Sequence, residues 1–336
     1  MTPLPSLVAL AVFSLLPPLV RKWGGLHKRV SQWEPHWVGF YYLYLGLALA
    51  SVVVRTRVLD VANLEMWQAK ILGGTAQAPN QYRIFTPFVV EGLRWAFGLD
   101  MVDAYAGQRF FWTLCNLCLC HLFLRSYLGS LGAALGTAVL AAILPFTYQS
   151  FAQETDPANL AAFLAALLAL QRGRDRHLYW LLPLATLNRE TVGVIPIIYA
   201  LVRAGERPRR QVLLALMGQL GGFALVYRGL RLIYGYRKYY CEPITVLANF
   251  WDLLPTEHLI LLYGPMWVLA LLGWREKPRL LRRALVAFPP FIALHYVIAL
   301  VYEARLFLPF APVIIALALL TILPQQGGAW GGAEEN

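Results

Sequence analysis

Long apolar runs recur along almost the whole chain, and they constrain its fold more than any other feature. Each is close to the ~20 residues that a helix needs to cross a hydrocarbon layer of ~30 Å. They lie at about 3–20, 37–54, 103–124, 131–148, 211–227, 259–274, 284–302 and 306–323, with a shorter one at 158–170. With 59% hydrophobic and 14% charged residues, this is not a soluble globular chain. We therefore expect an all-α, polytopic transmembrane helical bundle.

Basic clusters between these runs predict the orientation of the bundle. The net charge of +11 could suggest a nucleic-acid partner, but short Lys and Arg clusters flanking apolar runs are typical of cytoplasmic membrane loops. The clusters lie at 21–29, 172–177, 203–210 and 275–283. We expect all four on the cytoplasmic side and no nucleic-acid partner.

The stretch 178–202 carries Asn188, Arg189 and Glu190 in its middle. The basic clusters on both sides of it favour the same side of the membrane, so the stretch is predicted to be a hairpin of two short helices with Asn188 to Glu190 near its tip. This choice gives about 9–11 membrane segments in a single transmembrane domain over 1–326, with the N-terminus outside and the C-terminus inside. The Gly-rich tail at 327–336 is expected to be disordered.

The same topology assigns five segments to the non-cytoplasmic side: about 55–102, 149–157, the hairpin tip, 228–258 and the turn at 303–305. In the first of these, the apolar patches at 84–90 and 93–97 alternate with polar residues. Such patches predict amphipathic helices lying in the membrane interface. The first apolar run has no basic leader and is followed by Arg21 and Lys22, so we expect it to be a retained span.

No cofactor motif is present in the sequence. Cys115, Cys118 and Cys120 share one apolar run and lack a second ligand pair, while His258 and His295 stand alone. Gly-rich nucleotide loops of the Walker and dinucleotide types are absent. We expect no bound metal and no bound nucleotide.

Acidic residues gather in the segments assigned to the non-cytoplasmic side. They are Asp60, Glu65, Glu154, Asp156, Glu190 and Glu303. Asp60 lies at the membrane surface, where partial desolvation raises the basicity of a carboxylate and suits a general base; a solvated loop acid or a helix N-cap is the alternative. Asp156 precedes Pro157, a pattern typical of an N-cap followed by proline at the first helical position.

Arg189 and Glu190 are the most specific local signal. Charges near the bilayer centre cost about 2.5–3.5 kcal/mol each on insertion scales, so they are kept mainly where they pair or line a watery cavity. Adjacent residues cannot share a helix face, so each is expected to have a separate partner. The alternatives are a binding role and a purely structural ion pair.

Cations at three places suit an anionic ligand. Arg305, two residues after Glu303, has the planar fork that matches phosphate oxygens, although a snorkelling arginine is the alternative. Tyr82 and Arg83 lie in the first outer segment. Arg237 and Lys238 lie within a Tyr-rich stretch on the side of the membrane that basic residues usually avoid. Either the topology is locally wrong or these cations serve a ligand such as a lipid phosphate.

The layout resembles that of the C-type (GT-C) glycosyltransferases, multi-spanning enzymes that include protein O-mannosyltransferases and aminoarabinose transferases. The resemblance rests on four features: Asp60 in the first outer loop, the run from Trp67 through Gly73-Gly74 and Tyr82-Arg83 to Pro87, Asn188-Arg189-Glu190, and Glu303-x-Arg305-x-x-x-Pro309. The order of spans and loops resembles that of the family over most of the chain.

The resemblance implies a hexosyltransferase in a bacterial inner membrane that uses a sugar donor on polyprenyl phosphate. Asp60 would be the general base, with Glu65 as a fallback, and inversion would occur at the anomeric carbon. Arg305, with Arg83 or Arg189, would hold the donor phosphate. The acceptor would be a lipid, a glycan or a protein.

Two other classes remain open at this point. The family commonly has an acidic pair in its first loop, whereas the acid nearest to Asp60 is Glu65, which leaves a non-catalytic subunit as one alternative. A lipid or sugar transporter would also have broken helices and intramembrane charges. It would often show an internal repeat, and the two halves of this chain have no convincing similarity.

Overall fold

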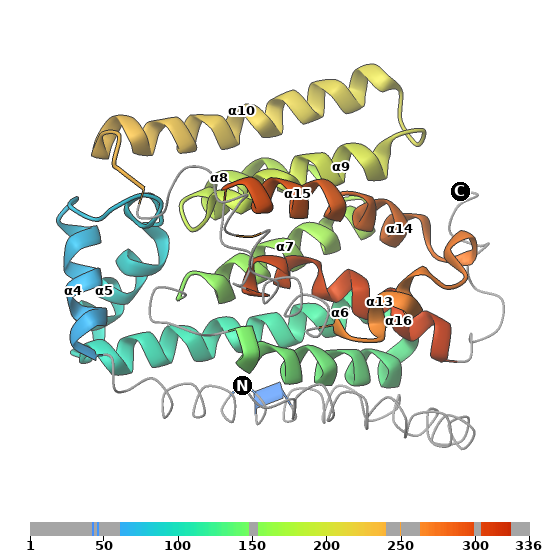
Figure 1. Cartoon of the computed structure of the whole chain (residues 1–336), viewed down its shortest axis with the longest axis horizontal. Helices are drawn as coiled ribbons and strands as arrows, with labels where there is room; N and C mark the ends of the chain where they lie inside the picture. The colour runs from blue at the N-terminus through green and yellow to red at the C-terminus, as the bar shows by residue number, and fades with distance from the viewer. Residues whose placement is uncertain are drawn as a thin grey trace.

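The computed structural model describes residues 42, 43, 46, 61–147, 154–239, 249, 263–298 and 304–323. Within these ranges every regular element is a helix, which confirms the all-α prediction for this part of the chain (Figure 1). Most of the apolar runs at 3–20 and 37–54, the tail at 327–336, Asp60 and Glu303 lie outside the described residues.

Four of the described helices are long and apolar enough to cross a membrane. They are Met101–Pro145, Arg209–Tyr234, Arg279–Val297 and Arg305–Ile322. The shorter apolar helix α7, Asp156–Gln171, lies among them. The protein is therefore a helical membrane protein, as its apolar runs indicate.

The longest helical run, α6 (Met101–Thr147), is broken at Gly129. This glycine has φ 66° and ψ 178°, a backbone conformation that residues with a Cβ rarely adopt. Leu117 and Ala141, on opposite sides of the break, pack in one buried cluster with Tyr42. The two apolar runs predicted at 103–124 and 131–148 therefore form the two arms of a helical hairpin.

The stretch 178–202 is a second hairpin, as predicted. It contains α8 (Leu178–Thr186), the 3-10 turn η5 (Glu190–Val194) and α9 (Ile195–Arg203). Arg203, at the end of α9, donates through Nε and Nη2 to the Asp175 carboxylate at 2.9 and 2.7 Å. Asp175 lies in η4 (Asp175–His177), just before α8, so the hairpin begins and ends at the same side of the bundle.

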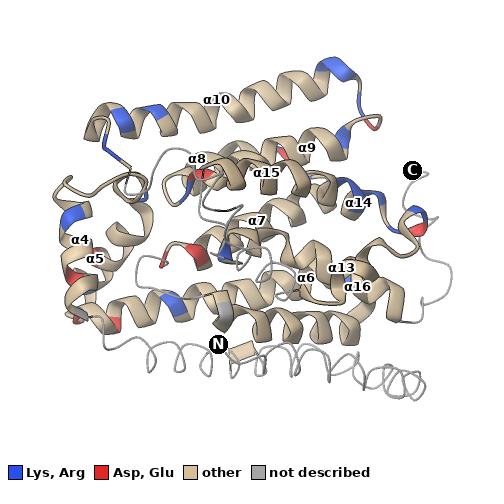
Figure 2. Cartoon of the chain, viewed as in Figure 1, with Lys and Arg blue, Asp and Glu red and all other residues tan. Residues whose placement is uncertain are grey.

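Three of the four predicted cytoplasmic clusters meet at that side, which we call the basic end (Asp175, Arg203, Glu206, Arg207, Arg279 and Arg283; Figure 2). Arg207 pairs with Asp175 at 2.7 Å. Arg279 and Arg283 belong to α14 (Arg279–Val286) and donate to backbone carbonyl oxygens at the end of α9, among them those of Ala204 and Leu201. The fourth cluster, at 21–29, lies outside the described residues.

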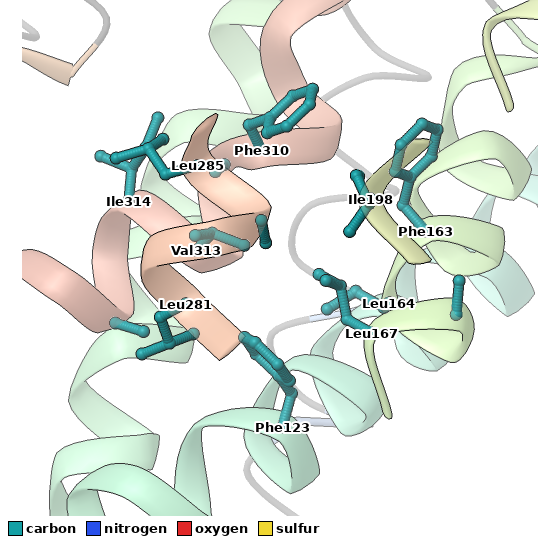
Figure 3. Packing of buried hydrophobic residues seen from close by; sticks show 14 of the residues in the cluster. Phe123, Phe163, Leu164, Leu167, Ile198, Leu281, Leu285, Phe310, Val313 and Ile314 are labelled. Carbon is teal, nitrogen blue, oxygen red and sulfur yellow. The ribbon is translucent and has the colours of Figure 1, made fainter. Parts of the chain in front are cut away.

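The core is a set of apolar side chains from helices far apart in the sequence (Figure 3). It joins α6, α7 and α9 to α13 (Met266–Leu271), α14, α15 (Phe288–Ile298), η7 (Ala304–Phe310) and α16 (Ala311–Ile322). Residues Ala311 to Leu319 of α16 are all buried, whereas α10 (Arg209–Tyr234) lies along one side of the bundle with much of its apolar surface uncovered. The short turn η6 (Trp274–Glu276) connects α13 to α14.

The segment predicted to be the first outer one forms a small helical unit at the end opposite the basic end (Figure 1). It contains α4 (Val61–Leu72), the turn η2 (Asn80–Tyr82) and α5 (Phe85–Phe97). Trp67 and Ile71 of α4 pack with Val90 of α5 and Tyr105 of α6. The apolar patches predicted at 84–90 and 93–97 belong to one helix, α5, whose exposed side chains include Phe88, Trp95 and Phe97.

Candidate functional site

The tip of the 178–202 hairpin lies at the end of the bundle opposite the basic end. We call this the tip end; it consists of residues 187–194 and the segments that contact them. The Phe85 amide donates to the Leu187 carbonyl at 3.0 Å. In the Asn188 side chain, Oδ1 accepts a hydrogen bond from Thr86 Oγ1 at 3.0 Å, and Nδ2 donates one to the Thr155 carbonyl at 2.8 Å. Three segments predicted on the non-cytoplasmic side therefore meet here.

Asp156 is the centre of the charges at the tip end. Its carboxylate forms an ion pair with Arg189, and Arg305 Nη1 donates to its Oδ2 at 2.8 Å. The three side chains are only 2–4% exposed. Arg189 has an extended backbone, with φ −162° and ψ 135°, between α8 and η5. Two guanidinium groups from distant parts of the chain thus share one buried carboxylate.

The prediction that Asp156 is a helix N-cap is wrong. Asp156 is the first residue of α7, and the N-cap position is taken by Thr155, whose side chain makes no capping hydrogen bond. Pro157 does lie in the first turn, as expected. A carboxylate held by two arginines has stronger partners than a backbone amide, so the local pattern was overridden by side chains from elsewhere in the fold.

Glu154 lies two residues before Asp156 and pairs with Arg109 of α6. Arg109 Nε donates to Glu154 Oε2 at 3.0 Å, and a second guanidinium nitrogen contacts Oε1. The two side chains are 9% and 3% exposed. The sequence reading missed Arg109, although a single arginine inside the apolar run 103–124 is a signal of the same kind as Arg189.

Glu190 pairs with Arg83 rather than with its neighbour Arg189. Arg83 Nη2 and Nε lie 2.5 and 3.3 Å from the two Glu190 carboxylate oxygens. The prediction that Arg189 and Glu190 have separate partners is confirmed. Burial raises the pKa of the Glu190 carboxyl, but Arg83 first and Arg189 second lower it more, to about 2. Glu190 is therefore an anion at neutral pH.

Three ion-paired groups adjoin one another, because Glu154 lies two residues before Asp156 and Arg189 is next to Glu190 in the sequence. We call them together the buried charge cluster. Its members are Arg83, Arg109, Glu154, Asp156, Arg189, Glu190 and Arg305. Every ion pair in it joins segments that are at least 33 residues apart in the sequence. Buried charges are tolerated when each one is paired and hydrogen-bonded, and an unpaired one is strongly destabilising. The cluster therefore fixes the relative positions of α6, α7, the hairpin tip and η7.

The structure does not bring every predicted site residue into this cluster. Glu65 is exposed on α4, and Arg237 and Lys238 are exposed in the segment after α10. Tyr82 hydrogen-bonds with the backbone of that segment, donating to the Gly235 carbonyl and accepting from the Arg237 amide, both at 2.9 Å. Asp60 and Glu303 lie outside the described residues.

His295 fits its interpretation as a structural residue. It is buried, its Nδ1 lies 2.8 Å from the Phe291 carbonyl oxygen, and its ring contacts those of Phe291 and Phe307.

Comparison with known proteins finds no match: no family model, no curated protein and no solved structure is similar to this chain.

Proposed function

We propose that the protein is a multi-pass membrane glycosyltransferase of the C-type kind in a bacterial inner membrane. It would move a sugar from a polyprenyl-phosphate donor to a lipid, glycan or protein acceptor on the non-cytoplasmic face. The observation that supports this proposal is the sharing of Asp156 by Arg189 and Arg305, at the end of the bundle where the predicted outer segments meet.

The two arginines provide the chemistry that a lipid-phosphate leaving group needs. When the bond between the sugar and the phosphate breaks, negative charge accumulates on the phosphate oxygens, and guanidinium donors that are already oriented stabilise it without reorganisation. Asp156 holds both guanidinium groups in place before the donor arrives. Its role in this proposal is to position Arg189 and Arg305 for the phosphate.

Asp60 would act as the general base in the same reaction. The acceptor oxygen attacks the anomeric carbon, its proton passes to the Asp60 carboxylate, and the electron pair of the broken bond leaves on the phosphate oxygen. In the sequence, Asp60 directly precedes Val61, the first residue of α4. Helix α4 packs against α5, and Phe85 and Thr86 of α5 contact the hairpin tip. Glu65, exposed on α4, is the second candidate for the base.

The base assignment is tested by sugar transfer in proteoliposomes supplied with a polyprenyl-phosphate sugar and a mixture of acceptors. Asp60→Asn is expected to abolish transfer without reducing expression or thermal stability. Glu65→Gln is the matched control and is expected to keep most of the activity. Transfer at the wild-type rate by Asp60→Asn would reject Asp60 as the base.

The phosphate role is tested with Arg305→Lys, which keeps the charge but loses the planar fork. The apparent KM for the donor is expected to rise, about tenfold for each charge-assisted hydrogen bond lost. Arg203→Lys at the basic end is the control, and it should leave the KM unchanged. Equal KM values for both variants would count against Arg305 as a phosphate ligand.

A second candidate function is a non-catalytic membrane subunit. It is favoured by the carboxylate partners that Arg83, Arg109, Arg189 and Arg305 already have. In that case Asp60→Asn and Arg305→Lys would leave sugar transfer by the assembled complex unchanged.

A lipid or sugar transporter would instead move a fluorescent lipid-linked sugar between leaflets in vesicles that contain no acceptor.

A further inference from the structure

The end of α10 nearest the tip end, together with the segment that follows it, carries a group of cations. It consists of Arg228, Arg231, Arg237 and Lys238. The sequence has no Asp or Glu between Arg207 and Tyr240, and the next acidic residue along the chain is Glu242. Figure 2 shows basic residues at both ends of α10, and only one of these ends belongs to the basic end. The second group needs a separate explanation.

Arg231 is buried in an aromatic setting. Its guanidinium carbon lies 4.1 Å from the centroid of the Tyr82 ring and 3.4 Å from that of Tyr227. Its Nη1 donates to the Tyr227 carbonyl at 2.9 Å, and its Nη2 donates to the Tyr239 hydroxyl at 3.3 Å. Cation–π contacts of this kind hold a guanidinium without neutralising it. The positive charge of Arg231 therefore adds to that of the cations around it.

The segment after α10 is fixed beside the helix end. Gly235, with φ 72°, ends α10 in a backbone conformation that favours glycine. Tyr82 then binds the carbonyl of Gly235 and the amide of Arg237, and the Ala78 amide donates to the Lys238 carbonyl at 3.0 Å. Hydrogen bonds of their backbone groups therefore hold Arg237 and Lys238 beside the end of α10.

The surface around these cations is apolar. Arg228, Arg237 and Lys238 are exposed, and so are Leu232 and Tyr236, at 80% and 81%. Further along α10, Leu225, Leu214 and Met217 are exposed as well. An apolar helix side that ends in exposed cations and a tyrosine has the composition of a membrane interface next to anionic headgroups.

We propose that this end of α10 binds the phosphate headgroup of an anionic membrane phospholipid, whose acyl chains lie along the exposed side of α10. Attraction of Arg228 and Arg231 to the C-terminal end of the helix dipole explains only those two, because Arg237 and Lys238 follow the helix. A free phosphate ion would not make use of the apolar side chains. The site adjoins the buried charge cluster, because Tyr82, which Arg231 contacts, directly precedes Arg83. The proposal does not depend on the proposed sugar transfer.

The experiment uses the full chain in nanodiscs of neutral phosphatidylcholine that contain a small fraction of photoactivatable phosphatidylglycerol. Crosslinks are expected on the peptide covering 225–239. Replacing Arg228, Arg237 and Lys238 together by Gln should reduce them about tenfold or more, since each cation contributes separately to headgroup attraction. The charge-preserving exchange R228K, R237K and K238R should keep them. Crosslinks at the basic end serve as the internal control and should not change.

Three outcomes would overturn the proposal. The first is an undiminished crosslink yield on 225–239 in the triple Gln variant with an unchanged melting temperature. The second is full competition by millimolar inorganic phosphate, which would indicate a free-phosphate site. The third is loss of polyprenyl-phosphate donor affinity in the triple Gln variant while its phosphatidylglycerol crosslinks persist, which would assign the cations to the donor.

Discussion

The two ends of the bundle use the same residue types in different surroundings. At the basic end, Arg203 and Asp175 are 11% and 8% exposed, but their further partners Glu206 and Arg207 are 33% and 40% exposed. In the buried charge cluster, Asp156, Arg189 and Arg305 are 2–4% exposed. Exposed ion pairs contribute little to stability, typically about 0–1 kcal/mol, whereas breaking a buried one costs far more. The basic end suits a role in orientation, and the tip end is where charges must have a structural or functional purpose.

The largest expected difference between the ends is in their accessibility from the two sides of the membrane. Single cysteines at Arg174 and at Lys238, in a chain whose four native cysteines are replaced by serine, should be labelled by an impermeant maleimide from opposite sides of sealed vesicles. The reason is that the basic clusters are expected to be cytoplasmic and the segment after α10 is not. Labelling of both positions from one side would contradict the predicted topology.

Removing the shared carboxylate should give a large loss of stability. Asp156→Ala leaves Arg189 and Arg305 buried without it, and the expected cost is about 3–5 kcal/mol. The measurement is the free energy of unfolding, or the melting temperature in detergent. A loss no greater than that of Arg207→Ala would show that the tip end is as well solvated as the basic end.

Replacing a whole pair should be much milder than breaking it. Glu154→Ala is expected to cost about 3–5 kcal/mol, because Arg109 stays buried, whereas Glu154→Leu combined with Arg109→Met should be near neutral. Thermal unfolding of the single and double variants gives the comparison. If the double variant is stable but inactive in sugar transfer, the pair is needed for function; a double variant as unstable as the single one would show that the pair itself is required by the fold.

The Arg83–Glu190 pair should have a smaller and pH-dependent effect, since Glu190 is 32% exposed. Its pKa falls from the ordinary 4.5 to about 2 in the folded protein, so its stabilisation is complete above 4.5 and is lost as the pH falls towards 2. The difference in melting temperature between wild type and Glu190→Gln should be constant from pH 8 to 5 and shrink below about pH 4. A difference that already declines at pH 6 would contradict the lowered pKa.

The smallest effect is expected at the basic end. Arg207→Ala removes one of two arginines on Asp175, and the second, Arg203, remains. Because Arg207 is the more exposed partner, the loss should stay below about 1 kcal/mol and decrease with added salt. Unfolding at low and high ionic strength measures it. A salt-independent loss of several kcal/mol would mean that the two ends do not differ in solvation.

The 178–202 hairpin shows which features could be predicted from local sequence patterns. The basic clusters at 172–177 and 203–210 predicted that 178–202 turns back, and the pairing of Arg203 with Asp175 confirms it. The separate partners of Arg189 and Glu190 were also predictable, because the side chains of adjacent residues point in different directions. Which partners they have was not predictable, since Asp156 and Arg83 lie 33 and 107 residues away in the sequence.

The helical class, the membrane environment and the meeting of three basic clusters at one end could be predicted from the sequence. These follow from composition and from the length of apolar runs, which act locally through the cost of placing polar groups in lipid. The binding of two arginines by Asp156, in place of a helix cap, and the pairing of Arg109 with Glu154 depend instead on the tertiary structure. A buried charge takes its partner from whichever segment the packing brings near, and packing depends on the whole chain.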